Sequence, residues 1–218
     1  TQVSSSCSSS PNLLKNADMS DEKLYIALMG LPARGKSTLG MRLKDAFRRD
    51  NIPTRIFNNG NLRRACRPAA ETSRAEFYSP ENKQALEERN NFARINMERA
   101  KNYLSGNGQV AILDAANVGR DRRAKIEAFL DDHPVLFIEC VNDDKEILSL
   151  SILEKTRLPE FGRLATGKAE KEFIKRIEYY KMAYQPLESE RNYIRLNSLQ
   201  NRIIGEKHTD STPLYAQL

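Results

Sequence analysis

Short apolar runs alternate along the chain with longer segments in which apolar residues recur at helical spacing. The first run, Leu24–Met29, ends at a glycine, and it is followed at roughly helical spacing by Leu39, Met41, Leu43 and Phe47. Further strand-like runs occupy residues 53–57, 109–113, 134–139 and 193–196. Helical patterns occupy residues 37–49, 82–104, 120–130, 145–154 and 168–183. This alternation predicts a mostly parallel sheet with helices on both faces, in a three-layer α/β fold.

The order of the elements also predicts where a ligand binds and where the domain ends. Right-handed crossovers place the carboxyl ends of parallel strands on one edge of the sheet, which is where ligands bind in such folds. The folded unit is expected over residues 21–204. The serine-rich residues 1–20 bury too little apolar surface to fold, and they are expected to be a disordered leader or a remnant of cloning. Residues 205–218 are polar and aperiodic and are expected to form a C-terminal tail.

The composition narrows the class of protein. The chain has 218 residues, 39% of them hydrophobic, which is enough for one domain whose core needs no disulfide or structural metal. The net charge of +6 suits an anionic ligand but is too small for a dedicated nucleic-acid surface. No apolar run approaches the ~18 residues of a membrane span. The three separate cysteines (Cys7, Cys66 and Cys140) form no disulfide framework, so a reducing, cytoplasmic location is expected.

A phosphate-binding motif follows the first strand, because residues 30–37 read Gly-Leu-Pro-Ala-Arg-Gly-Lys-Ser and fit G-x-x-x-x-G-K-[ST]. The glycines let the backbone turn its N–H groups toward phosphate oxygens, and the following helix directs its positive end to the same anion. Lys36 is expected to reach the β- and γ-phosphates, and the Ser37 hydroxyl to hold Mg²⁺. The strand before the motif and the helix after it predict a P-loop NTPase or kinase fold. The residues expected to bind the nucleotide are Gly30, Leu31, Pro32, Ala33, Arg34, Gly35, Lys36, Ser37 and Thr38.

Charged residues follow several of the predicted strands. Asp114 ends the third strand, where it can hold Mg²⁺ together with Ser37 or take a proton from an acceptor hydroxyl. The guanine-reading pattern N-K-x-D is absent, since residues 142–145 read Asn-Asp-Asp-Lys, so ATP is the expected nucleotide. Arginine binds a second phosphate through a planar fork of donors, although any single arginine fits a solvated helix face equally well. Together the arginines after the strands favour an anionic acceptor: Arg63, Arg64, Arg89, Arg120, Arg122, Arg123 and Arg176.

Several longer strings resemble the kinase domain of the 6-phosphofructo-2-kinase/fructose-2,6-bisphosphatase family. Besides residues 30–36, they are Phe-Asn-Asn-Gly-Asn-Leu-Arg-Arg at 57–64, Asp-Ala-Ala-Asn at 114–117, Phe-Ile-Lys-Arg-Ile-Glu-Tyr-Tyr at 173–180 and Tyr-Gln-Pro-Leu at 184–187. The similarity spans about residues 24–204, in order and at similar spacings. A phosphatase half would need a further domain with an Arg-His-Gly signature. This sequence has neither, so it is similar to a kinase-only version of the family.

The resemblance implies a reaction and a set of site residues. ATP would phosphorylate fructose 6-phosphate on its 2-hydroxyl, giving fructose 2,6-bisphosphate, with Lys36 and Asp114 as catalytic residues. Asn142 matches a nucleotide-side position of the family, where a cysteine is usual. Ala116 stands where the family has a threonine, so one hydrogen bond to the sugar, worth about 0.5–1.5 kcal/mol, is expected to be missing. The family pattern places the sugar phosphate on Arg63, Arg89, Arg122, Lys155, Arg176 and Tyr180.

Two other functions fit parts of the same pattern. A polynucleotide 5′-hydroxyl kinase would use a basic groove with stacking aromatics, whereas aromatics are 7% of this chain and tryptophan is absent. A non-catalytic ATP-binding module would keep Lys36 and make Asp114 dispensable. A sugar phosphate is the expected partner, neither a membrane nor nucleic acid is expected, and a homo-oligomer stays open. Tyr184 is expected to pack in the core, because it continues a helical pattern.

Overall fold

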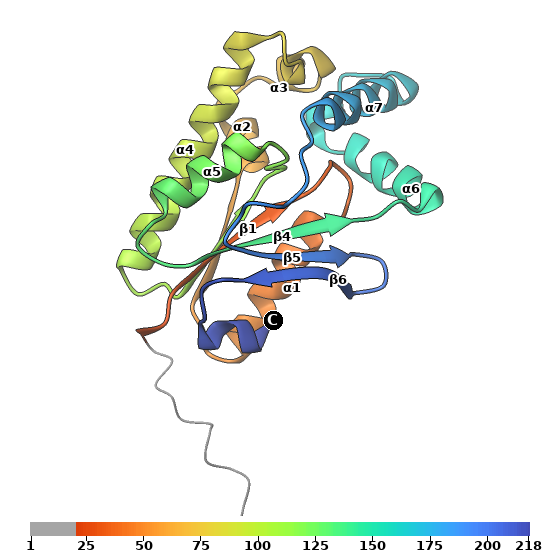
Figure 1. Ribbon diagram of the computed structural model, residues 1–218. Helices are drawn as coiled ribbons and strands as arrows, with labels where there is room; N and C mark the ends of the chain where they lie inside the picture. Colours follow the sequence, from red (N-terminus) through yellow and green to blue (C-terminus); the bar gives the residue numbers. More distant parts are fainter. Residues whose placement is uncertain (1–20) are drawn as a thin grey trace, which may run out of the picture.

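A six-stranded sheet forms the centre of the computed structural model, which describes residues 21–218 (Figure 1). The strand order is β2-β3-β1-β4-β5-β6, and all neighbours are parallel except β5 and β6. The mostly parallel sheet confirms the predicted fold class. Its strands are β1 (Leu24–Met29), β2 (Thr54–Asn58), β3 (Val110–Asp114), β4 (Val135–Val141), β5 (Asn192–Asn197) and β6 (Arg202–His208).

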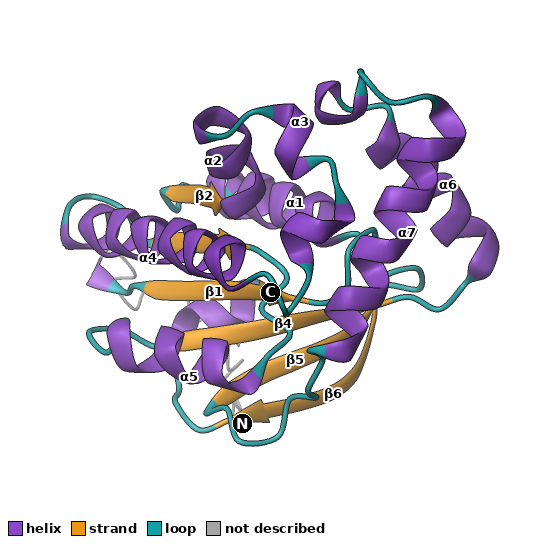
Figure 2. Ribbon diagram, turned by 90° about the horizontal axis from the view of Figure 1, so that it is seen from above, coloured by secondary structure: helices purple, strands orange, loops and turns teal. Residues whose placement is uncertain are grey.

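Helices cover both faces of the sheet and its carboxyl edge. One face carries α1 (Lys36–Arg49) and the short 3-10 helix η4 (Pro213–Gln217), and the other carries α4 (Lys83–Ser105) and α5 (Arg120–Phe129). Figure 2 shows α6 and α7 beyond the carboxyl ends of β1 and β4. No helix within residues 21–218 combines the length and apolarity that crossing a bilayer requires. The remaining elements are α2 (Asn59–Cys66), α3 (Ala69–Thr72), η2 (Ala75–Tyr78), α6 (Lys145–Thr156), η3 (Pro159–Phe161) and α7 (Thr166–Met182).

Burial on both faces explains why the first strand is apolar throughout. Every residue of β1 is fully buried. Tyr25, Ala27 and Met29 belong to the apolar cluster under α4 and α5, whereas Leu24 and Leu28 belong to the cluster under α1. Strands of a parallel sheet covered on both faces are expected to read as continuous apolar runs. The strand ends at Met29, and the phosphate-binding loop begins at the following residue, Gly30.

The sequence pattern missed α2, β6 and four short helices, α3, η2, η3 and η4. The pattern did not predict α2, which begins because the Asn58 side chain accepts a hydrogen bond from the Asn61 N–H at 2.8 Å. It also did not predict β6, an edge strand with an exposed face and no apolar alternation. Residues 205–218 are polar but are not a detached tail, because β6 runs to His208 and Leu214 is fully buried among core residues. The expectation for residues 1–20 lies outside the described residues.

Candidate active site

The phosphate-binding loop depends on unusual backbone angles between β1 and α1. Gly30 has φ 139° and Gly35 has φ 85°, both in the region that favours glycine. A Cβ atom at Gly30 would lie 2.6 Å from the carbonyl oxygen of Cys140 on the adjacent strand, so only glycine fits there. Ala33 also has a positive φ, of 61°, and belongs to a buried apolar cluster with Phe173 and Ile177 of α7. The loop is therefore held against the sheet on one side and joined by packing to α7 on the other.

Lys36 opens α1 and lies within this loop. Its Nζ donates a hydrogen bond to the Leu31 carbonyl at 2.7 Å, which keeps the ammonium beside the loop backbone. Burial lowers the pKa of Lys36 to about 8, an effect that Asp114 opposes and that the positive charges of Lys155 and Arg176 increase. The lysine thus stands in a positively charged, poorly hydrated place. An anion bound there would favour the protonated form.

Asp114 lies at the carboxyl end of β3, directly across from the end of β2. Its carboxylate is buried, with 5% of the residue exposed, and it accepts a hydrogen bond from the Asn58 amide at 2.5 Å. The strand register places Asn58 opposite Asp114, so the two side chains meet where both strands end. Asn58 therefore orients the carboxylate. The sequence did not single out this asparagine, although it lies in the Phe-Asn-Asn-Gly string.

The donor set fits Mg²⁺ in one particular way. Among residues 21–218, no three His, Cys, Asp or Glu side chains cluster closely enough to hold an ion by themselves. Ser37 and Asp114 do line the same cavity, and together they offer one hydroxyl and one carboxylate. Mg²⁺ commonly takes one or two such protein ligands and completes its shell with phosphate oxygens and water. The two residues thus fit a magnesium ion that arrives with a nucleotide.

One cavity of about 610 Å³ unites most of the predicted site residues. It is bounded by the phosphate-binding loop, the ends of β2 and β3, and the helices α2, α4, α5, α6 and α7. The predicted residues that line it are Pro32, Ala33, Gly35, Lys36, Ser37, Thr38, Arg63, Arg89, Asp114, Arg122, Lys155, Arg176 and Tyr180. Four predicted nucleotide contacts do not line it: Gly30, Leu31, Arg34 and Asn142.

Those four residues contribute to the site indirectly or lie away from it. Gly30 and Leu31 support the loop through the Cys140 contact and the Lys36 hydrogen bond already described. The guanidinium of Arg34 is buried, and it donates to the Pro32 carbonyl at 3.2 Å within the loop. Asn142 lies in the turn after β4, where its side-chain oxygen accepts the N–H of Asp144 at 2.9 Å, and its contact with the nucleotide stays a prediction.

The arginines of the cavity converge from three helices on one aromatic ring. Arg63 of α2, Arg89 of α4 and Arg176 of α7 lie 5.4, 5.8 and 3.9 Å from the centroid of the Tyr78 ring. Arg63 also forms a buried ion pair with Glu160, at 2.8 Å. The sequence singled out neither Tyr78 nor Glu160, since both lie in short 3-10 helices without a periodic pattern.

Two other predicted contacts border this arginine cluster. Burial would raise the pKa of Tyr180, but the positive charges of Arg176 and Arg89 outweigh it, so the net shift is downward. Arg122 donates a hydrogen bond to the Asn90 side chain on α4, and burial lowers its pKa. Tyr184 is a correction: it lies beyond α7, is 36% exposed, and donates its hydroxyl hydrogen bond to Glu139.

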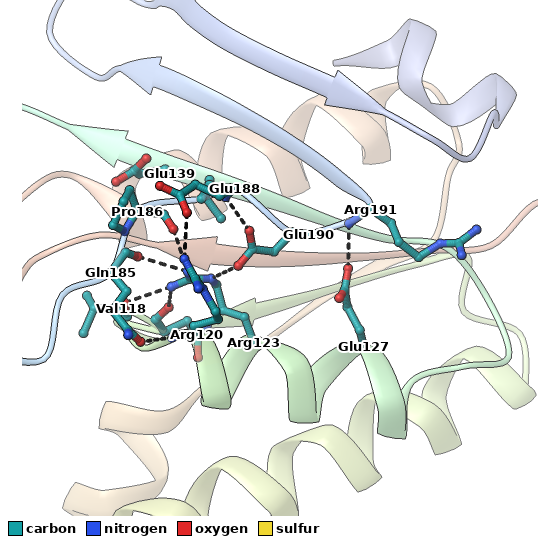
Figure 3. A network of polar contacts seen from close by, with 12 residues as sticks. Val118, Arg120, Arg123, Glu127, Glu139, Gln185, Pro186, Glu188, Glu190 and Arg191 are labelled. Atoms are coloured by element: carbon teal, nitrogen blue, oxygen red, sulfur yellow. Dashed lines mark hydrogen bonds and ion pairs between the residues drawn. The ribbon is translucent and has the colours of Figure 1, made fainter.

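A buried ion pair fixes the loop that follows Asp114 (Figure 3). The side chains of Arg123 and Glu190 are 0% and 3% exposed, and the Arg123 guanidinium donates to Glu190. It also donates to the carbonyls of Val118, at 2.8 Å, and Gln185, at 3.0 Å. Burial favours the neutral acid, yet Arg123 holds the pKa of Glu190 below its ordinary value. The pair thus joins the Asp114 loop to the segment after α7. That segment contains the Tyr-Gln-Pro-Leu string, whose Gln185 and Pro186 carbonyls accept hydrogen bonds from Arg123.

Breaking this pair is expected to cost the fold far more than breaking an exposed pair. Arg123→Met should lower the free energy of unfolding by about 3–5 kcal/mol, because it leaves a buried carboxylate without its partner. Arg120→Met is the matched control. It removes an ion pair to Glu188 whose side chains are 45% and 62% exposed, and should cost less than about 1 kcal/mol. Urea denaturation measures both values, and equal losses would contradict this reading of the Arg123 pair.

The fold and the cavity define a P-loop kinase, and comparisons with known proteins agree. The family model of 6-phosphofructo-2-kinase matches residues 12–210, so the chain belongs to the 6-phosphofructo-2-kinase family. A 6-phosphofructo-2-kinase/fructose-2,6-bisphosphatase of Caenorhabditis elegans is 39% identical over 75% of this chain and 37% of its own length. The human protein 6-phosphofructo-2-kinase/fructose-2,6-bisphosphatase 1 is 33% identical over 87% of this chain and 42% of its own length. The chain therefore spans only about two fifths of these relatives.

Solved structures support the fold alone. A structure of Chaetomium thermophilum Kti12 in complex with ADP-AlF3 matches with a TM-score of 0.52 and 15% identity, covering 79% of this chain and 88% of that one. A structure described as APE1195 matches with a TM-score of 0.52 and 16% identity, covering 83% and 88%. Both likenesses extend over most of the described domain.

Proposed function

We propose that this chain transfers the γ-phosphoryl group of ATP to the 2-hydroxyl of fructose 6-phosphate, forming fructose 2,6-bisphosphate and ADP. The observation that carries the proposal is that the arginine cluster, Asp114 and Lys36 line one cavity. A kinase needs a nucleotide site, a charge-stabilising centre and an acceptor site next to each other. The residues that line the cavity suit all three. The free thiols of Cys66 and Cys140 suit the reducing cytoplasm that we propose as its location.

In this proposal the phosphate-binding loop binds ATP. Its backbone N–H groups and the start of α1 bind the phosphates, and Lys36 neutralises charge that grows between the β- and γ-phosphates during transfer. Bound Mg²⁺, which Ser37 and Asp114 would hold, supplies further neutralisation of the phosphate oxygens. As the new O–P bond forms and the bond to the β-phosphate oxygen breaks, the 2-hydroxyl loses its proton. The Asp114 carboxylate would accept that proton, or, if it instead helps to hold Mg²⁺, the proton would pass to water.

In this proposal the arginines of the cavity and their neighbours bind fructose 6-phosphate. We assign the 6-phosphate of the sugar to Arg89, Arg122 and Arg176, with the Tyr180 hydroxyl beside them and Lys155 between the two substrates. Arg63 is already paired with Glu160, which offsets its charge and occupies its donors, so it contributes mainly to the shape of the acceptor site. The acceptor phosphate keeps its charge throughout the reaction. Binding by these groups is therefore nearly uniform between the ground state and the transition state.

A panel of acceptors with labelled ATP tests the proposal. Transfer to fructose 6-phosphate is expected, and transfer to a 5′-hydroxyl oligonucleotide is not. Label on the oligonucleotide instead would identify a polynucleotide kinase. If ATP binds but no acceptor is labelled, the chain is a non-catalytic module.

Removing an acceptor arginine should separate binding from chemistry. Arg176→Ala is expected to raise KM for fructose 6-phosphate by about tenfold or more, since a hydrogen bond to a charged group contributes about 1.5–3 kcal/mol. Both kcat and KM for ATP should change less than about threefold. Steady-state kinetics at saturating ATP measures this. Lys171→Ala, an exposed lysine of the same helix outside the cavity, is the control. An unchanged KM for the sugar, or a loss of ATP binding, would remove Arg176 from the acceptor site.

A further inference from the structure

Tyr78 is the one ring over which the three arginines Arg63, Arg89 and Arg176 all lie within the described residues. The residue is 3% exposed and ends the short helix η2. Its hydroxyl donates to the Thr72 carbonyl at 3.0 Å, which fixes the orientation of the ring. The start of η2 is tied to α7, because the Ala75 N–H donates to the Glu172 carboxylate at 2.6 Å. The ring is thus held at the back of the arginine cluster from two sides.

The cluster needs such a partner, because three guanidinium groups from different helices share one partly buried place. Like charges repel strongly where water is scarce. Glu160 neutralises Arg63, at 2.8 Å, and also lies 3.6 Å from Arg64. Arg176 has a different environment: its guanidinium lies 3.9 Å from the Tyr78 ring centroid, and its Nε is buried without a hydrogen-bond partner. The Tyr180 side chain hydrogen-bonds to this guanidinium, and no carboxylate of the described residues forms an ion pair with it.

An aromatic ring and a carboxylate hold arginines with different consequences. A carboxylate cancels a positive charge and occupies the donor fork, as Glu160 does for Arg63. The face of a ring attracts a guanidinium through its quadrupole but leaves the net charge and the N–H donors in place. A site that binds a doubly charged phosphate is therefore better served by an aromatic ring, which leaves the arginines charged, than by a carboxylate.

We propose that Tyr78 is a positioning residue of the acceptor site: its ring holds the guanidiniums of Arg89 and Arg176 in place for an acceptor phosphate without neutralising them. The inference rests on the proposed function for the identity of the acceptor, and it adds a residue that the family motifs quoted above do not include. The ring carries this role, and the hydroxyl serves to orient the ring. A variant that keeps the ring should therefore behave differently from one that removes it.

Steady-state kinetics of three variants tests this role. Tyr78→Leu is expected to raise KM for fructose 6-phosphate by about tenfold, with kcat and KM for ATP changed less than about threefold. Tyr78→Phe should stay within about threefold of the wild-type KM. Phe77→Leu is the matched control, because it removes the neighbouring buried ring, over which no guanidinium of the described residues lies. A merely structural role would give Phe77→Leu and Tyr78→Leu the same effect, which would overturn the proposal, as would an unchanged KM in Tyr78→Leu.

A binding measurement keeps the proposal separate from the proposed function. If the wild-type protein does not phosphorylate fructose 6-phosphate, the proposed function fails, and inorganic phosphate becomes the probe. Its dissociation constant is measured by calorimetry with a non-hydrolysable ATP analogue filling the phosphate-binding loop. Weakening by about tenfold in Tyr78→Leu but not in Tyr78→Phe would support the positioning role, and equal affinities would overturn it. Tyr78→Met, which fills more of the space of the ring, replaces Tyr78→Leu in either assay if the leucine variant does not fold.

Discussion

Lys36→Met is expected to lower kcat by at least about a hundredfold while leaving the protein folded. The methionine keeps most of the apolar stem, so the loop and α1 should pack as before. The ammonium, however, stabilises charge that develops only in the transition state, and such groups are typically worth about 10²–10³ in rate. Steady-state kinetics with fructose 6-phosphate and a thermal melt of the same sample measure the two parts. Retention of more than about a tenth of kcat, equivalent to less than about 1.4 kcal/mol, would show that Lys36 does not act this way.

The low pKa of Lys36 also predicts how ATP affinity depends on pH. With a pKa of about 8, Lys36 of the free protein is protonated at pH 7 and mostly neutral at pH 9. A bound triphosphate favours the protonated form and raises that pKa, so ATP affinity should fall as pH rises above 8, by up to about tenfold per pH unit. Cys140 does not titrate in this window, because burial raises the pKa of its thiol to about 11. Lys36→Met should show no such fall.

Asp114→Ala is expected to lower kcat by about a hundredfold or more, with ATP affinity largely kept. Whether the carboxylate takes the proton of the hydroxyl or holds Mg²⁺, its contribution is greatest in the transition state, and acid–base groups typically contribute about 10²–10⁴ in rate. Single-turnover rates at saturating substrates measure the chemical step directly. Asp121→Ala is the control, since Asp121 is an exposed acid that lines the same cavity. Equal, small losses in both variants would favour the non-catalytic alternative.

The sequence predicted the parts of the fold that depend on repeated patterns. The run Leu24–Met29 is β1 with the same bounds, because a strand buried on both faces must be apolar at every position. The helix expected over 120–130 is α5, Arg120–Phe129. Elements without a period were missed. The cap of α2 is a single asparagine, and β6 needs no apolar alternation because its hydrogen bonds to β5 hold it at the edge.

The candidate site was predictable where it depends on backbone motifs and less so where it depends on side-chain direction. The P-loop motif located Lys36 and Ser37, and the end of β3 located Asp114 in the same cavity. The roles of these residues stay predictions. Asn142 was placed at the site by matching positions, and this stays a prediction, since its side-chain oxygen accepts a hydrogen bond in the turn after β4 and it does not line the cavity. Tyr78 had no signal, because a ring that attracts arginines from three helices is recognisable only once those helices are packed together.

The packing of Ala33 links the phosphate-binding loop to the helix α7. Its methyl group belongs to the phosphate-binding loop and also to the apolar cluster that anchors α7, the helix of Arg176 and Tyr180. Close-packed apolar contacts are stiff and are insensitive to salt and pH, unlike hydrogen bonds through water. If the proposed function holds, the packing of Ala33 in this cluster helps to set the gap between the donor and acceptor phosphates. A bulkier residue at position 33 would lengthen the path of the phosphoryl group, and misplacement by about 1 Å can cost a hundredfold in rate.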